Sequence, residues 1–256
     1  MNSRARGIGR LVGMLAVALL ALQLFFLLRI ALMLVVAPQS TTFQRSEMWR
    51  LVEEQHALPW LQESVPRERI SDNLRRAVIA SEDAGFVDHH GVEWDAVEKA
   101  WSRNEKAEAR AEAQQSRAAT SRRNPNAKSR VVTPKVVGGS TISQQLAKNL
   151  FLSGERNGLR KAQELAITLM LELVLGKDRI LTAYLNNVEW GQGVFGAQAA
   201  AQHYFRTQAQ FLGPAQAARL AVMLPAPKRF ERAPSSPYVL GRSATIVARM
   251  GGVDLP

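Results

Sequence analysis

A long apolar run near the N-terminus constrains the fold of this chain most strongly. Residues 11–37 read LVGMLAVALLALQLFFLLRIALMLVVA, and about 20 helical residues are enough to cross a bilayer. Arg4, Arg6 and Arg10 precede the run, which predicts a cytoplasmic N-terminus by the positive-inside rule. The alternative is a signal peptide cleaved after Ala37, but its apolar region would be far longer than usual. We therefore expect a transmembrane anchor, with the rest of the chain on the outer side.

After the anchor the sequence pattern is mostly helical. Apolar residues recur at three- and four-residue steps from Arg67 onward, with Asp72 and Asn73 as suitable helix-starting residues. Alternating runs typical of strands are few, so a mainly α domain is predicted. Trp49 and Trp60 come between the anchor and the domain, and either lie at the headgroup level or pack against the domain. Later helices are expected at 143–151, 159–175, 177–186, 197–205 and 214–224.

Composition and charge exclude several classes of protein. The 256 residues suit one domain plus an anchor, and the absence of cysteine excludes disulfides, cysteine-bound zinc and a thiol nucleophile. The net charge of +11 is concentrated in residues 102–135, which hold nine Lys or Arg against three Glu. Basic charge suits nucleic acid, an anionic membrane surface or a pyrophosphate. With an anchor present and no interleaving of aromatic and basic residues, we expect no nucleic-acid partner.

The predicted organisation has five parts. The segment 102–135 has almost no large apolar residue before Val131, so a mobile basic loop is expected there. The parts are a cytoplasmic N-terminus (1–10), the anchor (11–37), a juxtamembrane connector (38–66), the main domain (67–230, including the loop 102–135) and a C-terminal segment (231–256).

Two acids, Glu82 and Asp83, stand at the end of an apolar helical pattern. One interpretation is a solvated helix end, which needs no function. The other is a carboxylate that emerges into a cleft, where burial raises its pKa and allows it to act as a general base. His89, which follows closely, is by itself more typical of a structural histidine than of a ligand or catalyst.

The segment GGSTISQQLAKN, residues 138–149, is harder to explain by packing alone. Its glycines allow close approach of a ligand, and Ser140 or Thr141 can cap the helix that follows. Exposed N–H groups at a helix start favour an anion. Gln144, Gln145 and Lys148 add amide donors and a cation. This set suits sugar hydroxyls and a phosphate, whereas a plain capped helix would explain only the serine and the glycines.

Four segments in order resemble the motifs of glycosyltransferase family 51, in particular its monofunctional biosynthetic peptidoglycan transglycosylases. They are SEDAGFVDHHG, GGSTISQQLAKN, RKAQE and RILTAYLNNVEWGQGVFGAQAAAQHYF. The resemblance covers roughly residues 43–228, and four motifs in order leave little room for coincidence. It implies one transmembrane helix followed by a lysozyme-like helical domain. This domain would have a groove between two lobes, the smaller of which dips into the membrane. It also implies the inner membrane of a bacterium, with the domain in the periplasm.

The resemblance further implies polymerisation of lipid II into β-1,4-linked glycan strands, with release of undecaprenyl pyrophosphate and inversion. Glu82 matches the catalytic base, and Glu164 matches a second acidic residue on the side of the leaving pyrophosphate. Asn186 and Gly196 match residues that maintain the fold. Matching substrate- or pyrophosphate-binding positions are Lys148, Arg156, Arg160, Lys161, Gln144, Gln145, Asn149, Ser140 and Thr141. Matching positions that shape the groove are Asp83, Phe86 and His89. Gln144 and Gln145 also match groove positions, which bond either to the surroundings of Glu82 or to sugars.

Partners implied by the resemblance are lipid II, the growing glycan strand and the membrane, with other cell-wall synthesis and division proteins as further candidates. No cofactor is required from the sequence. No ligand cluster demands a metal, although a divalent cation, Mg or Mn, is compatible with a pyrophosphate. Two alternatives remain: a catalytically silent lipid II-binding scaffold, and a lytic transglycosylase or muramidase, which also uses a glutamate. A cleaving enzyme leaves the basic pyrophosphate site unexplained.

Overall fold

The computed structural model describes residues 3–95, 139–152 and 158–256, with isolated positions between 98 and 110. The predicted mobile loop at 102–135 lies largely outside these residues, and Arg156 lies wholly outside them. The chain divides into two compact units, one formed by Met1–Gly91 with Ile142–Pro256 and the other by Val92–Thr141. The description below concerns the first unit, which holds nearly all of the described secondary structure.

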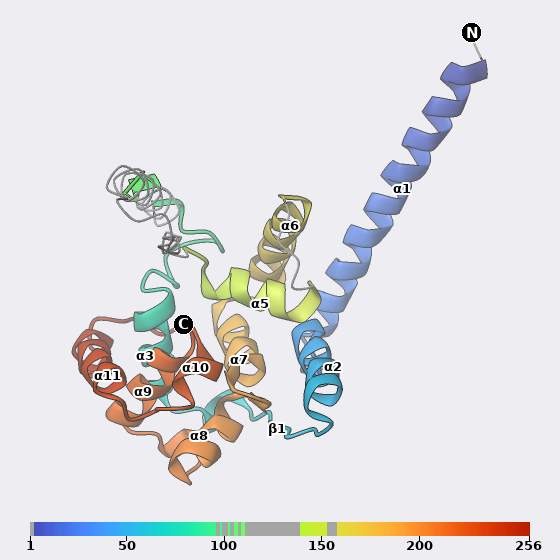
Figure 1. Ribbon diagram of the computed structural model, residues 1–256. Coiled ribbons are helices and arrows are strands. Elements are labelled where there is room, and N and C mark those ends of the chain that lie inside the picture. The colour runs from blue at the N-terminus through green and yellow to red at the C-terminus, as the bar shows by residue number, and fades with distance from the viewer. Residues whose placement is uncertain are drawn as a thin grey trace, which may run out of the picture. The chain divides into compact units, whose positions relative to one another are not determined.

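The fold is mainly helical, as predicted, with a single small sheet among the described residues (Figure 1). The five later helices, α5 to α9, lie within a residue or so of their expected ranges. The elements are α1 (Ser3–Leu32), α2 (Thr42–Gln55), β1 (Leu61–Gln62), η1 (Arg67–Arg69), α3 (Asp72–Glu82), α5 (Ile142–Phe151), α6 (Gly158–Leu175), α7 (Lys177–Asn187), β2 (Glu189–Gly191), β3 (Val194–Phe195), α8 (Ala197–Phe205), η2 (Ala209–Phe211), α9 (Pro214–Met223), α10 (Pro227–Phe230) and α11 (Pro237–Met250).

Helix α1 corresponds to the predicted anchor. Its segment Gly9–Leu32 is long and apolar enough to cross a membrane, with a mean hydropathy of 2.7. Large apolar side chains are exposed along most of this segment, and Figure 1 shows α1 extending beyond the other helices. A fully apolar surface of this length is unfavourable in water but suits lipid. The helix ends at Leu32, five residues before the end of the apolar run, and the chain then turns.

The C-terminal half of α1 contacts helices α5 and α6. Gln23 and Gln163 of α6 exchange two side-chain hydrogen bonds of 2.8 and 3.1 Å. Phe26 packs edge-on against Phe151 at the end of α5, with ring centroids 5.5 Å apart. An amide pair among apolar side chains satisfies groups that would be costly to bury alone. These contacts hold α6 and the end of α5 beside the C-terminal half of the apolar helix.

The expected connector contains a helix, α2, which begins with a capping box. Thr41 accepts the N–H of Gln44, and the Gln44 side chain accepts the N–H of Thr41. These reciprocal bonds satisfy N–H groups at the helix start that would otherwise lack partners. Of the two connector tryptophans, Trp60 packs against the ring of Phe195 at 4.6 Å, whereas Trp49 is 73% exposed.

Two groups of helices form most of the core. Helices α3, α9 and α11 pack on one another, and α5 packs on both α6 and α7. The expected C-terminal segment therefore contributes α11, which begins at the cap residue Ser236 and buries Val239 and Ile246. The sheet has the order β1–β3–β2, in which β1 is parallel and β2 antiparallel to β3.

Asn186 and Gly196 keep the fold together around β3, as the sequence predicted. The side-chain amide of Asn186 donates to the carbonyl of Val65 at 2.8 Å and accepts the N–H of Val65 at 3.0 Å. Gly196 has φ +87°, and a Cβ there would lie 2.8 Å from the carbonyl oxygen of Asn186. Only glycine fits this position without strain, because both the backbone conformation and the space exclude a side chain.

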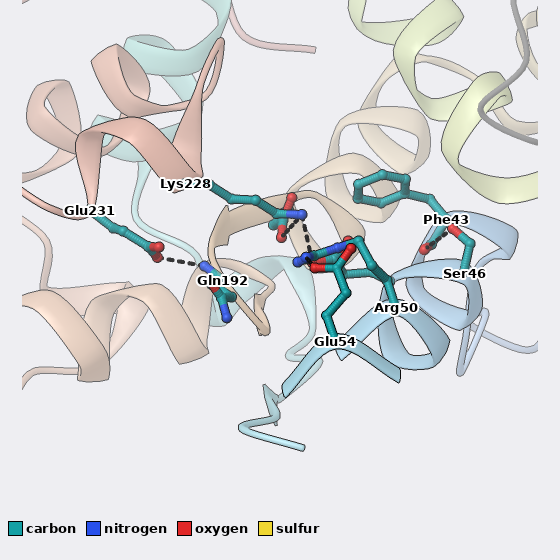
Figure 2. A network of polar contacts seen from close by, with 9 residues as sticks. Phe43, Ser46, Arg50, Glu54, Gln192, Lys228 and Glu231 are labelled. Atoms are coloured by element: carbon teal, nitrogen blue, oxygen red, sulfur yellow. Dashed lines mark hydrogen bonds and ion pairs between the residues drawn. The ribbon is translucent and has the colours of Figure 1, made fainter. Parts of the chain in front are cut away.

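A network of charged groups joins α2, β2 and α10 (Figure 2). Lys228 of α10 lies 2.5 Å from a carboxylate oxygen of Glu47 on α2 and 3.5 Å from one of Glu189 on β2. Arg50 makes a forked pair with Glu47 and also bonds to Glu54. Both Glu47 and Glu189 are buried; Arg50 and Lys228 pair with the charge of Glu47, whereas Oε1 of Glu189 has no hydrogen-bond partner among the described residues.

The two buried acids of this network have opposite pKa shifts. Burial raises the pKa of Glu47, but hydrogen bonds and ion pairs with Arg50 and Lys228 outweigh it, so the net shift is downward. Burial raises the pKa of Glu189 to about 7, with further contributions from Glu47 and Glu231 and only partial compensation by Lys228. Glu189 therefore keeps its proton in the folded state up to near neutral pH.

Glu189 should make the protein less stable as the pH rises. Between pH 4.5 and about 7 the folded state holds a proton on Glu189 that the unfolded chain releases, so the free energy of unfolding falls as pH increases. Glu189→Gln has no group to titrate at this position, so its free energy of unfolding should not show this decrease with pH. We expect the variant to gain ~3 kcal/mol relative to wild type on going from pH 5 to pH 8, measured by urea unfolding of detergent-solubilised protein.

The matched control is Glu54→Gln, which changes an exposed acid of the same network. It should alter stability little and equally at both pH values. A difference between Glu189→Gln and wild type that does not change with pH would contradict this account.

Candidate functional site

Helix α3 carries Glu82 at its C-terminal end. The helix starts at the cap residue Ser71, whose hydroxyl accepts the N–H of Leu74 at 3.1 Å. One face, which includes Leu74 and Val78, is fully buried. Asp83 departs from helical geometry, with φ −162° and ψ 71°. Glu82 is therefore the last side chain whose direction α3 sets.

Glu82 is partly buried and bonded to α5, because Nε2 of Gln145 donates to its Oε2 at 3.1 Å. Burial raises the pKa of Glu82, hydrogen bonds from Gln145 and Ser81 lower it, and the charge of Asp83 raises it; the net shift is upward. A carboxylate with a raised pKa is a better proton acceptor near neutral pH. A solvated helix end is the wrong description here, since Asp83 is only 4% exposed.

Asp83 connects the first motif to the second. One of its oxygens lies 2.8 Å from Nε2 of His89, and the other accepts the N–H of Ile142, the first residue of α5, at 2.9 Å. Nδ1 of His89 accepts the N–H of Gly91 at 3.0 Å, so the ring proton is on Nε2 and is donated to Asp83. The sequence suggested an anion at this helix start, and Asp83 supplies one from the protein itself.

Tyr184 of α7 completes the surroundings of Glu82, although the sequence assigned it no role. Its hydroxyl donates to Oε1 of Gln145 at 2.9 Å, and the residue is 1% exposed. Burial, followed by the charges of Glu82 and Asp83, raises the pKa of Tyr184 well above 10. Tyr184, Gln145 and Glu82 thus form a hydrogen-bonded series that crosses three helices.

A second buried acid, Glu172 of α6, was also missed. Its Oε1 accepts the hydroxyl of Ser143 at 2.5 Å and lies 2.8 Å from Nζ of Lys177. The same ammonium lies 4.6 Å above the ring of Phe86, which is fully buried. The sequence offered one signal for this ion pair: a single acid within the apolar run TLMLELVL, followed by a lysine. These contacts position Phe86 through α5, α6 and α7 together.

The second motif lies on α5 and just before it, with mixed exposure. Thr141, Gln144 and Asn149 are buried, while Ser140 and Lys148 are exposed. Lys148 therefore lies at the surface of α5. The buried amide of Asn149 lies one position further along α5, on the packed side of that helix.

Glu164, 3% exposed, forms a compact charged cluster on α6. Arg160 donates to one carboxylate oxygen at 3.0 Å, and Lys161 bonds to the other. Two cations against one anion leave a net charge of +1 on a single helix face. Since α6 packs on α5, this cluster and Gln145 belong to neighbouring helices.

No group of three or more His, Asp or Glu side chains among the described residues is placed to hold a metal ion. The four carboxylates described above, Glu82, Asp83, Glu164 and Glu172, instead bond to protein groups. The described part of the chain therefore gives no ligand set from which to derive a metal-dependent step.

The helical architecture and the carboxylate at the end of a buried helix define a class. This is an enzyme with a lysozyme-like domain behind one apolar helix. The chain belongs to the transglycosylase family, whose model matches residues 53–116 and 121–251. That makes it an enzyme of the glycosyltransferase class.

Several relatives match this chain over most of both sequences. The chain is 50% identical to a biosynthetic peptidoglycan transglycosylase of Cupriavidus metallidurans, over 98% of this chain and 99% of the relative. It is 47% identical to one of Burkholderia thailandensis, over 100% and 91% of the two chains. It is 48% identical to one of Paraburkholderia xenovorans, over 94% and 90%.

Gly91 should not tolerate a side chain. Its φ is +89°, and a Cβ would lie 2.8 Å from Cγ2 of Thr168 and 3.0 Å from Cγ of Glu172. We expect Gly91→Ala to lower the free energy of unfolding by ~2 kcal/mol or more, because backbone strain and the clash add. Urea unfolding measures it.

Gly241 provides the control. It lies within α11 with open space around its Cα, so Gly241→Ala should raise stability by up to about 1 kcal/mol. Equal effects of the two substitutions would show that Gly91 is not constrained in this way.

Proposed function

We propose that the chain is a membrane-anchored peptidoglycan transglycosylase that polymerises lipid II, with Glu82 as general base. The observation that carries the proposal is the carboxylate of Glu82, partly buried at the end of α3, with a raised pKa and a single amide donor from α5. Family membership supports the reaction class, and the names of the relatives support peptidoglycan as the product.

In the proposed reaction, Glu82 accepts the proton of the sugar 4-hydroxyl of an incoming lipid II. That oxygen attacks the anomeric carbon of the growing strand as the bond to undecaprenyl pyrophosphate breaks, which forms a β-1,4 bond with inversion. Such a single displacement requires no enzyme nucleophile. The balance between burial and the bond from Gln145 suits the base, because it must be ionised before the reaction yet basic enough to accept the proton.

The proposed pyrophosphate site is basic. Arg160 and Lys161 together outweigh the single charge of Glu164, and Lys148 is exposed on the neighbouring helix. Cations held in place before the reaction stabilise charge that develops on the leaving oxygens. In this proposal Glu164 orients its two cations rather than contacting the pyrophosphate. A divalent cation could bind the pyrophosphate itself, but no step is derived through it.

The membrane part of the proposal rests on α1 and α6. Residues Gly9–Leu32 can span a bilayer, and α6 is bonded to α1 at Gln23. Leu159 and Leu173 of α6 are more than 80% exposed, which suits contact with lipid. We propose a single-pass protein of the bacterial inner membrane, with a cytoplasmic N-terminus and a periplasmic catalytic domain.

Replacing Glu82 tests the base. Glu82→Gln keeps the size of the side chain but cannot accept a proton, so we expect lipid II polymerisation to fall at least about a hundredfold. The wild-type rate should decline as the pH falls through the raised pKa of Glu82, above 4.5, because protonation disables the base. Products of the detergent-solubilised protein are separated by size and digested with a muramidase.

Glu68→Gln, an exposed acid on η1, is the matched control and should retain full activity. Substantial polymer from Glu82→Gln would contradict the assignment of the base. Lipid II that binds to folded wild type without forming polymer would favour a silent scaffold.

Replacing Glu164 tests the cluster on α6. Glu164→Gln removes the charge that fixes the directions of Arg160 and Lys161. We expect kcat to fall ~10²-fold, since misdirected cations stabilise the leaving pyrophosphate poorly. Thermal unfolding serves as the control for folding. An unchanged kcat would show that the cluster is only structural.

A further inference from the structure

Three side chains from three helices are joined end to end beside the proposed base. The hydroxyl of Tyr184 on α7 donates to Oε1 of Gln145 on α5 at 2.9 Å. Nε2 of Gln145 then donates to Oε2 of Glu82 on α3 at 3.1 Å. Tyr184 is 1% exposed and belongs to the core, so its hydroxyl stays at a fixed place relative to α5.

Only one of the two orientations of the Gln145 side-chain amide gives both of its ends suitable hydrogen-bond partners. If it were reversed, its oxygen would face the ionised carboxylate of Glu82, and two acceptors would oppose each other. In the observed orientation both ends of the amide have partners of the correct kind. Without the hydroxyl of Tyr184, the amide oxygen loses this partner, and one of the bonds that fix the direction of the amide is gone.

We propose that Tyr184 is a positioning residue, whose hydroxyl holds the amide of Gln145 so that its N–H faces Glu82 and keeps the base ionised and correctly directed. The inference rests on the proposed role of Glu82 as general base. It assigns Gln145 to the orientation of the base, whereas the family resemblance left open whether Gln145 bonds to the surroundings of Glu82 or to the substrate.

Tyr184 suits this task over a wide pH range. Because burial and the charges of Glu82 and Asp83 raise its pKa well above 10, it remains a hydroxyl and can always donate. A buried tyrosine hydroxyl needs a hydrogen-bond partner, so a position that served only for core packing would be filled equally well by phenylalanine.

Within the part of the chain that the structure describes, few groups act on the charge of Glu82. Asp83, the next residue, opposes ionisation, and His89 is bonded to Asp83. Tyr184 faces both acids from α7, and α5 contributes the amide of Gln145.

From α9, the backbone carbonyl of Ala221 lies 3.5 Å from the hydroxyl of Ser81. Ser81 itself contributes a hydrogen bond that lowers the pKa of Glu82. Loss of the donor from Gln145 would therefore raise the pKa of Glu82, since burial and Asp83 both act in that direction.

The test is the pH dependence of lipid II polymerisation by Tyr184→Phe. Tyr204→Phe is the matched control, because it also removes one partly buried hydrogen bond of a tyrosine hydroxyl. That hydroxyl donates to the carbonyl of Trp190 at 2.9 Å and lies near the acids Glu189 and Glu231. We expect the acidic limb of the kcat profile to move about 0.5–1 pH unit upward in Tyr184→Phe only. At a pH well above the limb, kcat should return to within about twofold of wild type, with KM unchanged.

A second variant keeps the test decisive if Tyr184→Phe folds poorly. Gln145→Met removes the amide but keeps the length of the side chain, and it should shift the limb in the same direction. In that background Tyr184→Phe should add no further shift, because the two residues act in series. Thermal unfolding of each variant separates loss of stability from the shift of the limb.

Several outcomes would overturn the proposal. One is an acidic limb that stays in place in both Tyr184→Phe and Gln145→Met. Another is a rise in KM with an unmoved limb, which would place Gln145 on the substrate. Failure of the proposed function is distinguishable, because Glu82→Gln would then retain polymerisation whatever Tyr184→Phe does.

Discussion

The carboxylate of Asp83 at the start of α5 is the contact on which the candidate site depends. It accepts the N–H of Ile142, 59 residues further along the chain, and bonds to His89 with its other oxygen. A negative charge at a helix N-terminus is favourable. Because Asp83 follows Glu82 directly, this bond sets where α5 begins relative to the base. Gln145, one turn into α5, can then reach Glu82.

Buried acids elsewhere in the unit differ in what they join. Glu47 bonds to a cation on α10, and Glu172 accepts donors from α5 and α7, so each holds separate elements together. Glu164 is paired only with Arg160 and Lys161 of its own helix in the bonds described above. A buried charge paired within one helix contributes little to tertiary structure and carries a desolvation penalty. That cost is easier to understand for a binding site than for a structural contact.

The sequence predicted the helices better than their connections. Period-3.6 apolar patterns located α5 to α9, because packing of one face determines both pattern and helix. The helix in the connector, α2, was missed because its apolar residues are sparse, although Thr41 and Gln44 have the spacing of a capping box. Tyr184 and Glu172 could not be assigned, because their partners lie far away in sequence and come together only in the fold. Family motifs identified Glu82 and Gln145, but not that they bond to each other.

Because α6 is bonded to α1, the cluster of Glu164, Arg160 and Lys161 lies on a helix beside the apolar segment. The proposed base, Glu82, lies on a different helix. Gln23 lies on α1 nine residues before its end, and its bond to Gln163 holds the neighbouring Glu164 cluster beside the apolar helix. A pyrophosphate attached to a lipid stays near the headgroup layer, whereas sugars extend outward. Glu82 belongs to α3, which packs with α9 and α11 rather than with the anchor. In the proposed function, the cations on α6 would therefore bind the pyrophosphate end of the substrate, and Glu82 on α3 would act on its sugar end.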